Sequence, residues 1–194
     1  MSTRTISVAV GGLFIAQMVT AMIGTMLVAD GDPSQTVMAV SALFMTLSAV
    51  SVFVIGVLAY QVLKPFNQKL AIWYPIMRGT EFAVSVFCSI YLLTQSQAVS
   101  NQMLWIYVPT AIGGLIFTHL LRVSGLVHKS VAWLGLIGYG LFGLGTVLDF
   151  AGVVNLDGSG TIMLVPGLLF ELVVLPYWLI SRRHGFNLSQ TDAR

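Results

Sequence analysis

Four ionisable side chains lie inside long apolar runs of this sequence: Arg78, Glu81, Asp149 and Glu171. An ionisable group at bilayer depth costs about 2.5–3.5 kcal/mol on insertion scales, so such groups face partners or polar cavities. An arginine beside two carboxylates could bind a headgroup, a small anion or a proton. The alternative interpretation is a structural ion-pair network that only fixes the register of the helices.

Depth in the membrane groups three of these residues. A helix that starts near Ala71 places Arg78 about 10 Å and Glu81 about 15 Å from one membrane face. A later, oppositely directed helix that ends near Ile180 places Glu171 about 14 Å from the same face. We therefore predict that Arg78, Glu81 and Glu171 meet in one layer, with a formal charge of −1 when all three are ionised.

The angular positions of the side chains support this grouping. At 100° per residue, Tyr74, Arg78, Glu81 and Ser85 share one face of their helix, which should therefore point into the protein. On the last apolar run, Gly167 lies one turn before Glu171, and a glycine lets another helix approach closely.

The secondary candidates are Tyr74 and Ser85 on the helix face of Arg78 and three further polar residues, Asp149, Arg122 and His119. Asp149 lies near the far end of its run, on the same face as several glycines. This position favours one of two structures: a packing seam of small residues that ends at the Asp149 carboxylate, or a vestibule that opens outward. His119 and Arg122 lie near the membrane face opposite to that of Asp149. A place at the membrane interface is enough to account for a histidine at position 119. Milder polar residues in the first two runs are expected to form hydrogen bonds between helices: Gln17, Thr20, Gly24, Ser41, Ser48 and Ser51.

Familiar catalytic and cofactor motifs are absent from the sequence. It contains no HExxH, GxSxG, CxxC or P-loop motif, and no lysine within an apolar run. A zinc site needs three or four converging ligands, which the three histidines do not offer. We predict no metal, no cofactor and no catalytic residue.

The composition of the chain predicts that transmembrane helices position these side chains. Of the 194 residues, 57% are hydrophobic and only 8% are charged, against about 25% charged in a soluble domain. Six runs have the roughly 20 apolar residues that a spanning helix needs. We therefore predict a single all-α domain, a bundle of six transmembrane helices over 6–28, 37–63, 71–95, 104–121, 131–154 and 161–180, with a tail over 181–194.

The basic residues predict the orientation of this bundle, because Lys and Arg accumulate in cytoplasmic loops. All of them except Arg78 fall on one side of a six-span arrangement: Arg4, Lys64, Lys69, Arg122, Lys129, Arg182, Arg183 and Arg194. The other side holds Asp30, Asp32 and Asp157. Both termini are therefore predicted to be cytoplasmic. The first run, about 23 residues long, exceeds a signal-peptide core and is expected to remain uncleaved.

Three segments of the C-terminal two-thirds resemble a bacterial multi-pass membrane family called domain of unknown function 4386. The segments are 76–83 with Arg78 and Glu81, 120–127 with Arg122 followed by 131–139, and 166–172 with Glu171 followed by 178–180. The family often has a proline at the position of Val127-His128, so the loop of this chain is expected to differ from the family's loop. The resemblance implies a bacterial inner-membrane protein and assigns no activity.

Taken together, the sequence favours a non-enzymatic membrane protein of the inner (cytoplasmic) membrane. It would be an accessory subunit or a module that binds a lipid or small molecule. A small proton-coupled or solute transporter is the alternative, and an intramembrane lipid-modifying enzyme ranks third, because no histidine base lies at the depth of Ser85 and Cys88. The expected partners are the bilayer, a membrane protein or second copy, and a lipid or small-molecule ligand. Nucleic acid is not expected, because the net charge is only +2.

Overall fold

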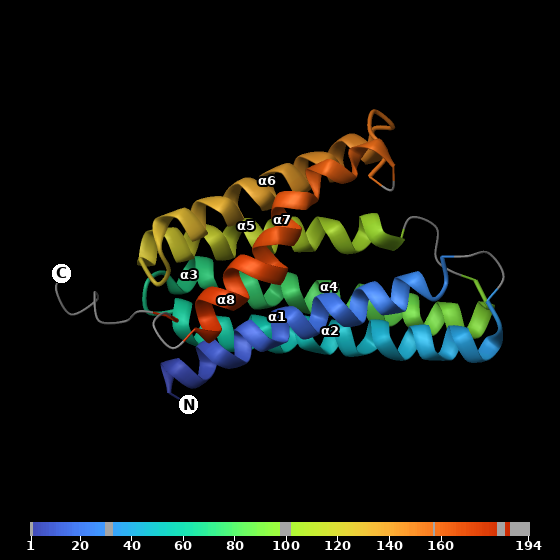
Figure 1. The fold of residues 1–194 in the computed structure, drawn as a ribbon, viewed down its shortest axis with the longest axis horizontal. Helices are drawn as coiled ribbons and strands as arrows, with labels where there is room; N and C mark the ends of the chain where they lie inside the picture. Colours follow the sequence, from blue (N-terminus) through green and yellow to red (C-terminus); the bar gives the residue numbers. More distant parts are fainter. Residues whose placement is uncertain (1, 30–32, 98–101, 157, 182–184, 187–194) are drawn as a thin grey trace.

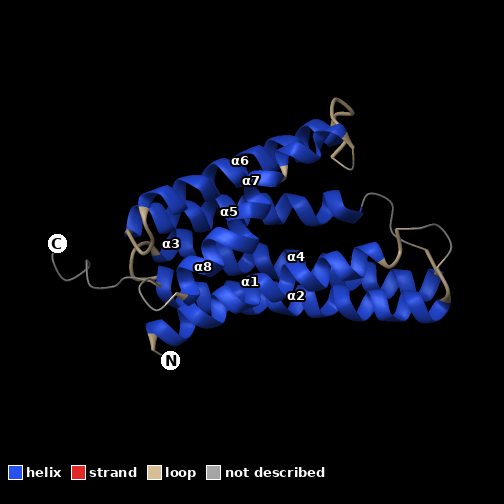
Figure 2. Ribbon diagram, in the orientation of Figure 1, coloured by secondary structure: helices blue, strands red, loops and turns tan. Residues whose placement is uncertain are grey.

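All regular structure in the described residues is helical (Figure 2). The computed structural model describes residues 2–29, 33–97, 102–156, 158–181, 185 and 186. Its long helices are α1 (Thr3–Met26), α2 (Gln35–Leu63), α4 (Trp73–Gln95), α5 (Gln102–Ser124) and α6 (Lys129–Phe150), and the short α3 (Gln68–Ala71) leads into α4. Five helices are long and apolar enough to cross a membrane. The prediction of an all-helical chain with membrane-length helices is confirmed for these residues.

Polar side chains and glycines mark the ends of these helices. The side chains of Ser2, Ser34 and Asn67 accept hydrogen bonds from the free amides of the first turns of α1, α2 and α3, as helix N-caps do. Gly125 and Gly152 follow the ends of α5 and α6 with φ angles of 69° and 70°. Glycine adopts this left-handed conformation without steric penalty.

The last predicted span, 161–180, is not one continuous helix. It consists of a 3₁₀ segment η1 (Ser159–Met163), α7 (Val165–Leu169), a π-helical segment η2 (Phe170–Val174) and α8 (Leu175–Ile180). Pro166 and Pro176 stand at the starts of α7 and α8. Proline lacks an amide proton, and the wider π turn before Pro176 accommodates the missing hydrogen bond. The apolar stretch Val165–Ile180 is also shorter than the five long helices.

The long helices run antiparallel, so that their ends gather at the two ends of an elongated bundle (Figure 1). We call the end that holds Thr3, Leu63 and Ser124 the basic end, and the end that holds Met26, Gln35 and Gln95 the opposite end. α2 packs against α1 and α4, and α5 packs against α4 and α6. The last stretch, which we define as Val165–Ile180 with α7, η2 and α8, runs between α6 and α1. Arg182, Arg183, Arg194, Asp30, Asp32 and Asp157 lie outside the described residues, as does most of the predicted tail.

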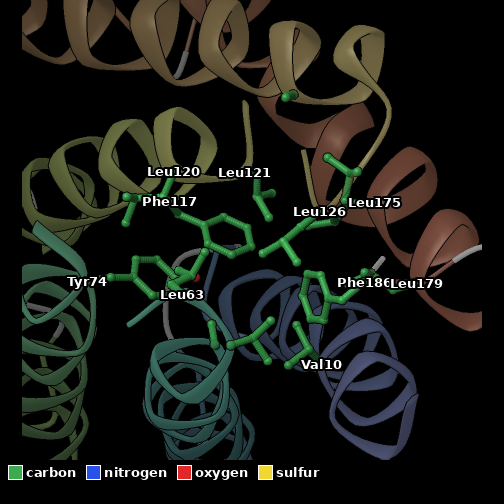
Figure 3. Packing of buried hydrophobic residues seen from close by; sticks show 14 of the residues in the cluster. Val10, Leu63, Tyr74, Phe117, Leu120, Leu121, Leu126, Leu175, Leu179 and Phe186 are labelled. Atoms are coloured by element: carbon green, nitrogen blue, oxygen red, sulfur yellow. The ribbon is translucent and has the colours of Figure 1, made fainter. Parts of the chain in front are cut away.

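The densest apolar core lies toward the basic end. Phe117, Leu120 and Leu121 of α5 meet Tyr74, Val10 and Leu179 there (Figure 3). By contrast, large apolar side chains on the outer faces of the bundle are more than half exposed, among them Phe87, Trp105 and Val147. An apolar outer surface of this kind suits lipid as the surrounding solvent.

Candidate functional site

Arg78 is the centre of a buried polar cluster. Its side chain on α4 is fully buried. Its Nη1 lies 2.8 Å from Oε2 of Glu81, one turn along the same helix, and its Nη2 lies 3.5 Å from Oε1 of Glu171 in η2. Its Nε donates to the Tyr74 hydroxyl at 3.2 Å. The structure thus brings together the three predicted cluster residues and Tyr74.

Two more residues complete this cluster. The Tyr139 hydroxyl on α6 donates to Oε1 of Glu171 and accepts from Nη2 of Arg78 at 3.4 Å. Gln17 on α1 donates from Nε2 to Oε2 of Glu171 at 3.2 Å. We define the polar cluster as Gln17, Tyr74, Arg78, Glu81, Tyr139 and Glu171, which come from three long helices and the last stretch.

Glycines give the cluster's large side chains their space. A Cβ at Gly56 of α2 would lie 2.9 Å from Cβ of Arg78, so only glycine lets α4 approach α2 this closely. A Cβ at Gly114 of α5 would collide with three ring atoms of Tyr139. The ring of Tyr139 therefore occupies the position of a missing side chain, and its hydroxyl is held beside Arg78.

A glycine contact also places Glu171. A Cβ at Gly138 of α6 would lie 2.8 Å from the backbone nitrogen of Gly167 in α7. The two backbones therefore touch one turn before Glu171 and directly beside Tyr139. This is the close approach that Gly167 predicts, and it brings the hydroxyl of Tyr139 within reach of the carboxylate.

A cavity of about 340 Å³ adjoins the cluster on the side of the opposite end. Most of its wall is apolar, and its polar wall includes Gln17, Glu81, Tyr139 and Glu171. Arg78 is not among the lining residues. The volume falls within the range of about 300–1,000 Å³ for sites that bind small molecules.

The cluster separates this cavity from the dense core, as two helices show. On α1 the core residues end at Phe14 and the cavity residues begin at Gln17. On α2, which runs the other way, the core begins at Ile55 and the cavity ends at Val52. The main apolar core therefore lies between the cluster and the basic end, whereas the other side holds the cavity and a smaller core of Met38, Ala42 and Leu92.

The secondary candidates lie in different places. Ser85 lines the cavity one turn from Glu81. Asp149 accepts a hydrogen bond at 3.0 Å from the backbone amide of Leu156 and so fastens the turn after α6. Arg122 stacks over the ring of Trp133 at 4.8 Å, and His119 is exposed on α5. The structure brings none of these last three into the cluster.

The milder polar residues of the first two helices differ in their bonds. Ser41 and Ser48 donate across to backbone carbonyls of Gly24 and Gln17 on α1, as predicted for interhelical hydrogen bonds. Ser51 and Thr20 instead donate to carbonyls of their own helices. Among the described residues, no group of three His, Cys, Asp or Glu side chains could hold a metal ion.

Comparison with protein-family models, with curated proteins and with solved structures finds no match for this chain. The resemblance to the family of unknown function named above therefore stays a prediction. The site must be interpreted from its own chemistry.

Tyr139 and Gln17 are the site residues that sequence reasoning did not assign to the cluster. For Gln17 the sequence predicts only a hydrogen bond to a neighbouring helix, and for Tyr139 it predicts no role. The position of each residue along its apolar run is the feature that could have assigned both to the cluster. Both lie near the middle of their apolar runs, where a polar atom needs a partner.

Proposed function

We propose that this protein is a six-span protein of a bacterial inner (cytoplasmic) membrane and that it binds a lipid or another small amphipathic molecule without catalysing a reaction. Five helices of membrane length, together with the shorter stretch Val165–Ile180 that returns to the basic end, support six crossings. The bacterial origin rests on the resemblance to the family of unknown function.

Charge supports the proposed orientation. Arg4, Lys64, Lys69, Arg122 and Lys129 all lie at the basic end, whereas the sequence connecting helices at the opposite end contains no Lys or Arg. Positive charge accumulates on the cytoplasmic side of membrane proteins. The basic end, and with it both termini, would therefore face the cytoplasm.

The cavity carries the functional proposal. It is mostly apolar, it lies between helices at membrane depth, and its charged groups are confined to the end where Glu81 and Glu171 stand. A wall of this composition matches a ligand with one polar group and an apolar body. An ion-pair network with a purely structural role would not need an adjoining cavity of this size.

The experiment that tests this proposal is mass spectrometry of the small molecules and proteins that co-purify after gentle detergent extraction. Ala21 lines the cavity, so Ala21→Trp should fill it. Ala16 is exposed on the same helix and does not line the cavity, so Ala16→Trp is the matched control.

We expect a bound compound at near-equal molar ratio in the wild type and in Ala16→Trp, and at least a tenfold lower ratio in Ala21→Trp. An equal ratio in all three proteins, or no bound compound in any of them, would contradict the proposal. A protein found at equal molar ratio in place of a small molecule would favour an accessory subunit.

A small transporter is the second candidate, because Glu171 lies in an interrupted helix. Transporter sites are often built from discontinuous helices near the middle of the membrane. Here the π segment that carries Glu171 lies between two proline-started helical segments. Uptake of the co-purified compound into vesicles that contain the protein, blocked by Ala21→Trp, would favour transport over binding alone.

A further inference from the structure

The polar end of the cavity offers hydrogen-bond acceptors and negative charge. Glu81 and Glu171 both line it and keep 9% of their side-chain surface exposed, whereas Arg78 has none exposed and does not line the cavity. The guanidinium lies behind the carboxylates, with its donors directed at Glu81, Glu171, Tyr74 and Tyr139. A ligand in the cavity therefore meets the carboxylates and not the arginine.

Gln17 adds an acceptor without a partner. Its side chain is only 4% exposed, it lines the cavity, and its Oε1 has no hydrogen-bond partner in the described structure. Because Nε2 donates to the Glu171 carboxylate, flipping the amide would set two acceptor oxygens against each other. Buried polar atoms without partners are rare, and each calls for an explanation. A donor group on a ligand would satisfy this oxygen.

Five hydroxyl groups that line the cavity already donate their protons to other acceptors. Thr25, Ser48, Thr110 and Thr161 each donate to a backbone carbonyl, and Tyr139 donates to Glu171. Each such oxygen retains lone pairs that can accept a hydrogen bond. An anionic headgroup would therefore find few free donors here, whereas a donor headgroup would find several acceptors.

The opening of the cavity indicates where an apolar chain would lie. α1 packs against α8 and η2, but it makes no comparable packing with α7. Met22 on α1 and Val165 and Leu168 on α7 line the cavity and are partly exposed on the outside of the bundle. The cavity is thus bordered by apolar side chains on the side where two helices diverge, at the level of lipid chains.

We propose that the ligand is an amphiphile with a hydrogen-bond-donating cationic headgroup, such as a primary ammonium group on an alkyl chain. The headgroup lies against Glu81, Glu171 and Oε1 of Gln17, and the chain leaves between α1 and α7. With Arg78, Glu81 and Glu171 ionised, the cluster carries a formal charge of −1, which one ammonium group neutralises. This inference rests on the proposed binding function and specifies its ligand.

Three probes with the same twelve-carbon chain test the headgroup: dodecylamine, dodecanoic acid and dodecanol. Their binding to the purified wild-type protein is measured by native mass spectrometry from a neutral maltoside detergent. We expect the amine to bind at least tenfold more tightly than either other probe, and Ala21→Trp to abolish this binding.

A second variant tests the acceptor on α1. Gln17→Leu removes the acceptor Oε1, together with the Nε2 donor to Glu171, with little change in volume, and it leaves the contacts of Arg78 in place. It should weaken amine binding at least tenfold, since a hydrogen bond to a charged group is stronger than one between neutral groups. Gln61→Leu, at an exposed position of α2 that does not line the cavity, is the matched control and should bind the amine like the wild type.

The outcomes separate this inference from the proposed function. Acid or alcohol binding that equals or exceeds amine binding, and that Ala21→Trp blocks, would overturn the headgroup inference but leave the cavity as a binding site. Amine binding that Ala21→Trp does not reduce would also overturn the inference, because it would place the amine elsewhere. Failure of all three probes to bind would overturn it too, and with no co-purified compound the proposed function would fall as well.

Discussion

At the scale of the residue, Arg78 depends closely on its surroundings. It is fully buried, yet its guanidinium has two carboxylates and two tyrosine hydroxyls within bonding range and lies 5.3 Å from the centre of the Tyr74 ring. A buried charge of this kind is tolerated only when its partners are in place. The partners depend on Arg78 in the same way, because its removal leaves Glu81 and Glu171 without their cation.

Arg78→Ala should therefore destabilise the fold by about 3–5 kcal/mol, the usual cost of breaking a buried ion pair from one side. The free energy of unfolding is measured in mixed detergent micelles. Arg122→Ala is the matched control, since Arg122 lies over Trp133 near the bundle surface and its loss should cost about 0.5–1 kcal/mol. Equal losses in the two variants would contradict the central role of Arg78.

Combining Arg78→Ala with Glu81→Gln tests the pairing itself. The two side chains are 2.8 Å apart, so part of the loss from Arg78→Ala should be recovered when the partner carboxylate is neutral. Coupling energies of roughly 0.5–3 kcal/mol are typical of such contacts. Strictly additive losses would show that the two groups do not interact in the detergent-solubilised protein.

The residues that could be predicted at this scale are those whose burial is costly. Arg78, Glu81 and Glu171 are recognisable because a formal charge at membrane depth needs a partner, and depth alone indicates which charges can meet. Tyr139 and Gln17 escaped assignment because a neutral polar side chain in an apolar run can bond equally well to its own helix, a neighbour or water. Only the packing of Tyr139 over Gly114 decides which partner it has.

At the scale of the element, the contact between α6 and α7 decides where Glu171 lies. Gly138 and Gly167 touch through their backbones, and the π segment begins three residues after Gly167. Hydropathy could predict an apolar stretch over 161–180 but not its division into 3₁₀, α and π segments. That division follows from two prolines and from the packing of the stretch against α6.

Gly138→Ala should push α6 and α7 apart, because the added methyl group would lie 2.8 Å from a backbone nitrogen that cannot rotate away. Overpacking of this kind costs about 1–3 kcal/mol. Gly140→Ala on the same helix is the matched control, since a Cβ there meets nothing within 4 Å. It should be neutral or stabilising by up to about 1 kcal/mol, as alanine is the better helix former.

Thermal or denaturant unfolding in the same detergent measures both glycine variants. Gly138→Ala should also lower ligand occupancy in the co-purification experiment, because Tyr139 and Glu171 would separate. A Gly138→Ala protein as stable as Gly140→Ala would show that the close backbone contact is not needed.

At the scale of the whole molecule, the bundle has its main apolar core on one side of the polar cluster and a cavity on the other. The all-helical class and the positions of the long helices could be predicted, because the need for roughly 20 apolar residues is a strong constraint. The cavity could not, because it depends on which helices diverge and on how the last stretch crosses the bundle. Residues that face lipid, the core or the cavity are all of the same apolar types, so the sequence does not distinguish them.

The orientation of the bundle is tested by single cysteines in a Cys88→Ala background, which removes the chain's one native thiol. Gln97→Cys lies at the opposite end, and Lys69→Cys and Ser181→Cys lie at the basic end. In intact cells an impermeant maleimide should label only the cysteine at 97, and the other two should react after the membrane is permeabilised, because Lys and Arg accumulate on the cytoplasmic side of membrane proteins. The reverse pattern would invert the bundle and turn the cavity toward the cytoplasm. Labelling at 181 but not at 69 in intact cells would show that Val165–Ile180 does not complete a sixth crossing, so that only the five long helices would span the membrane.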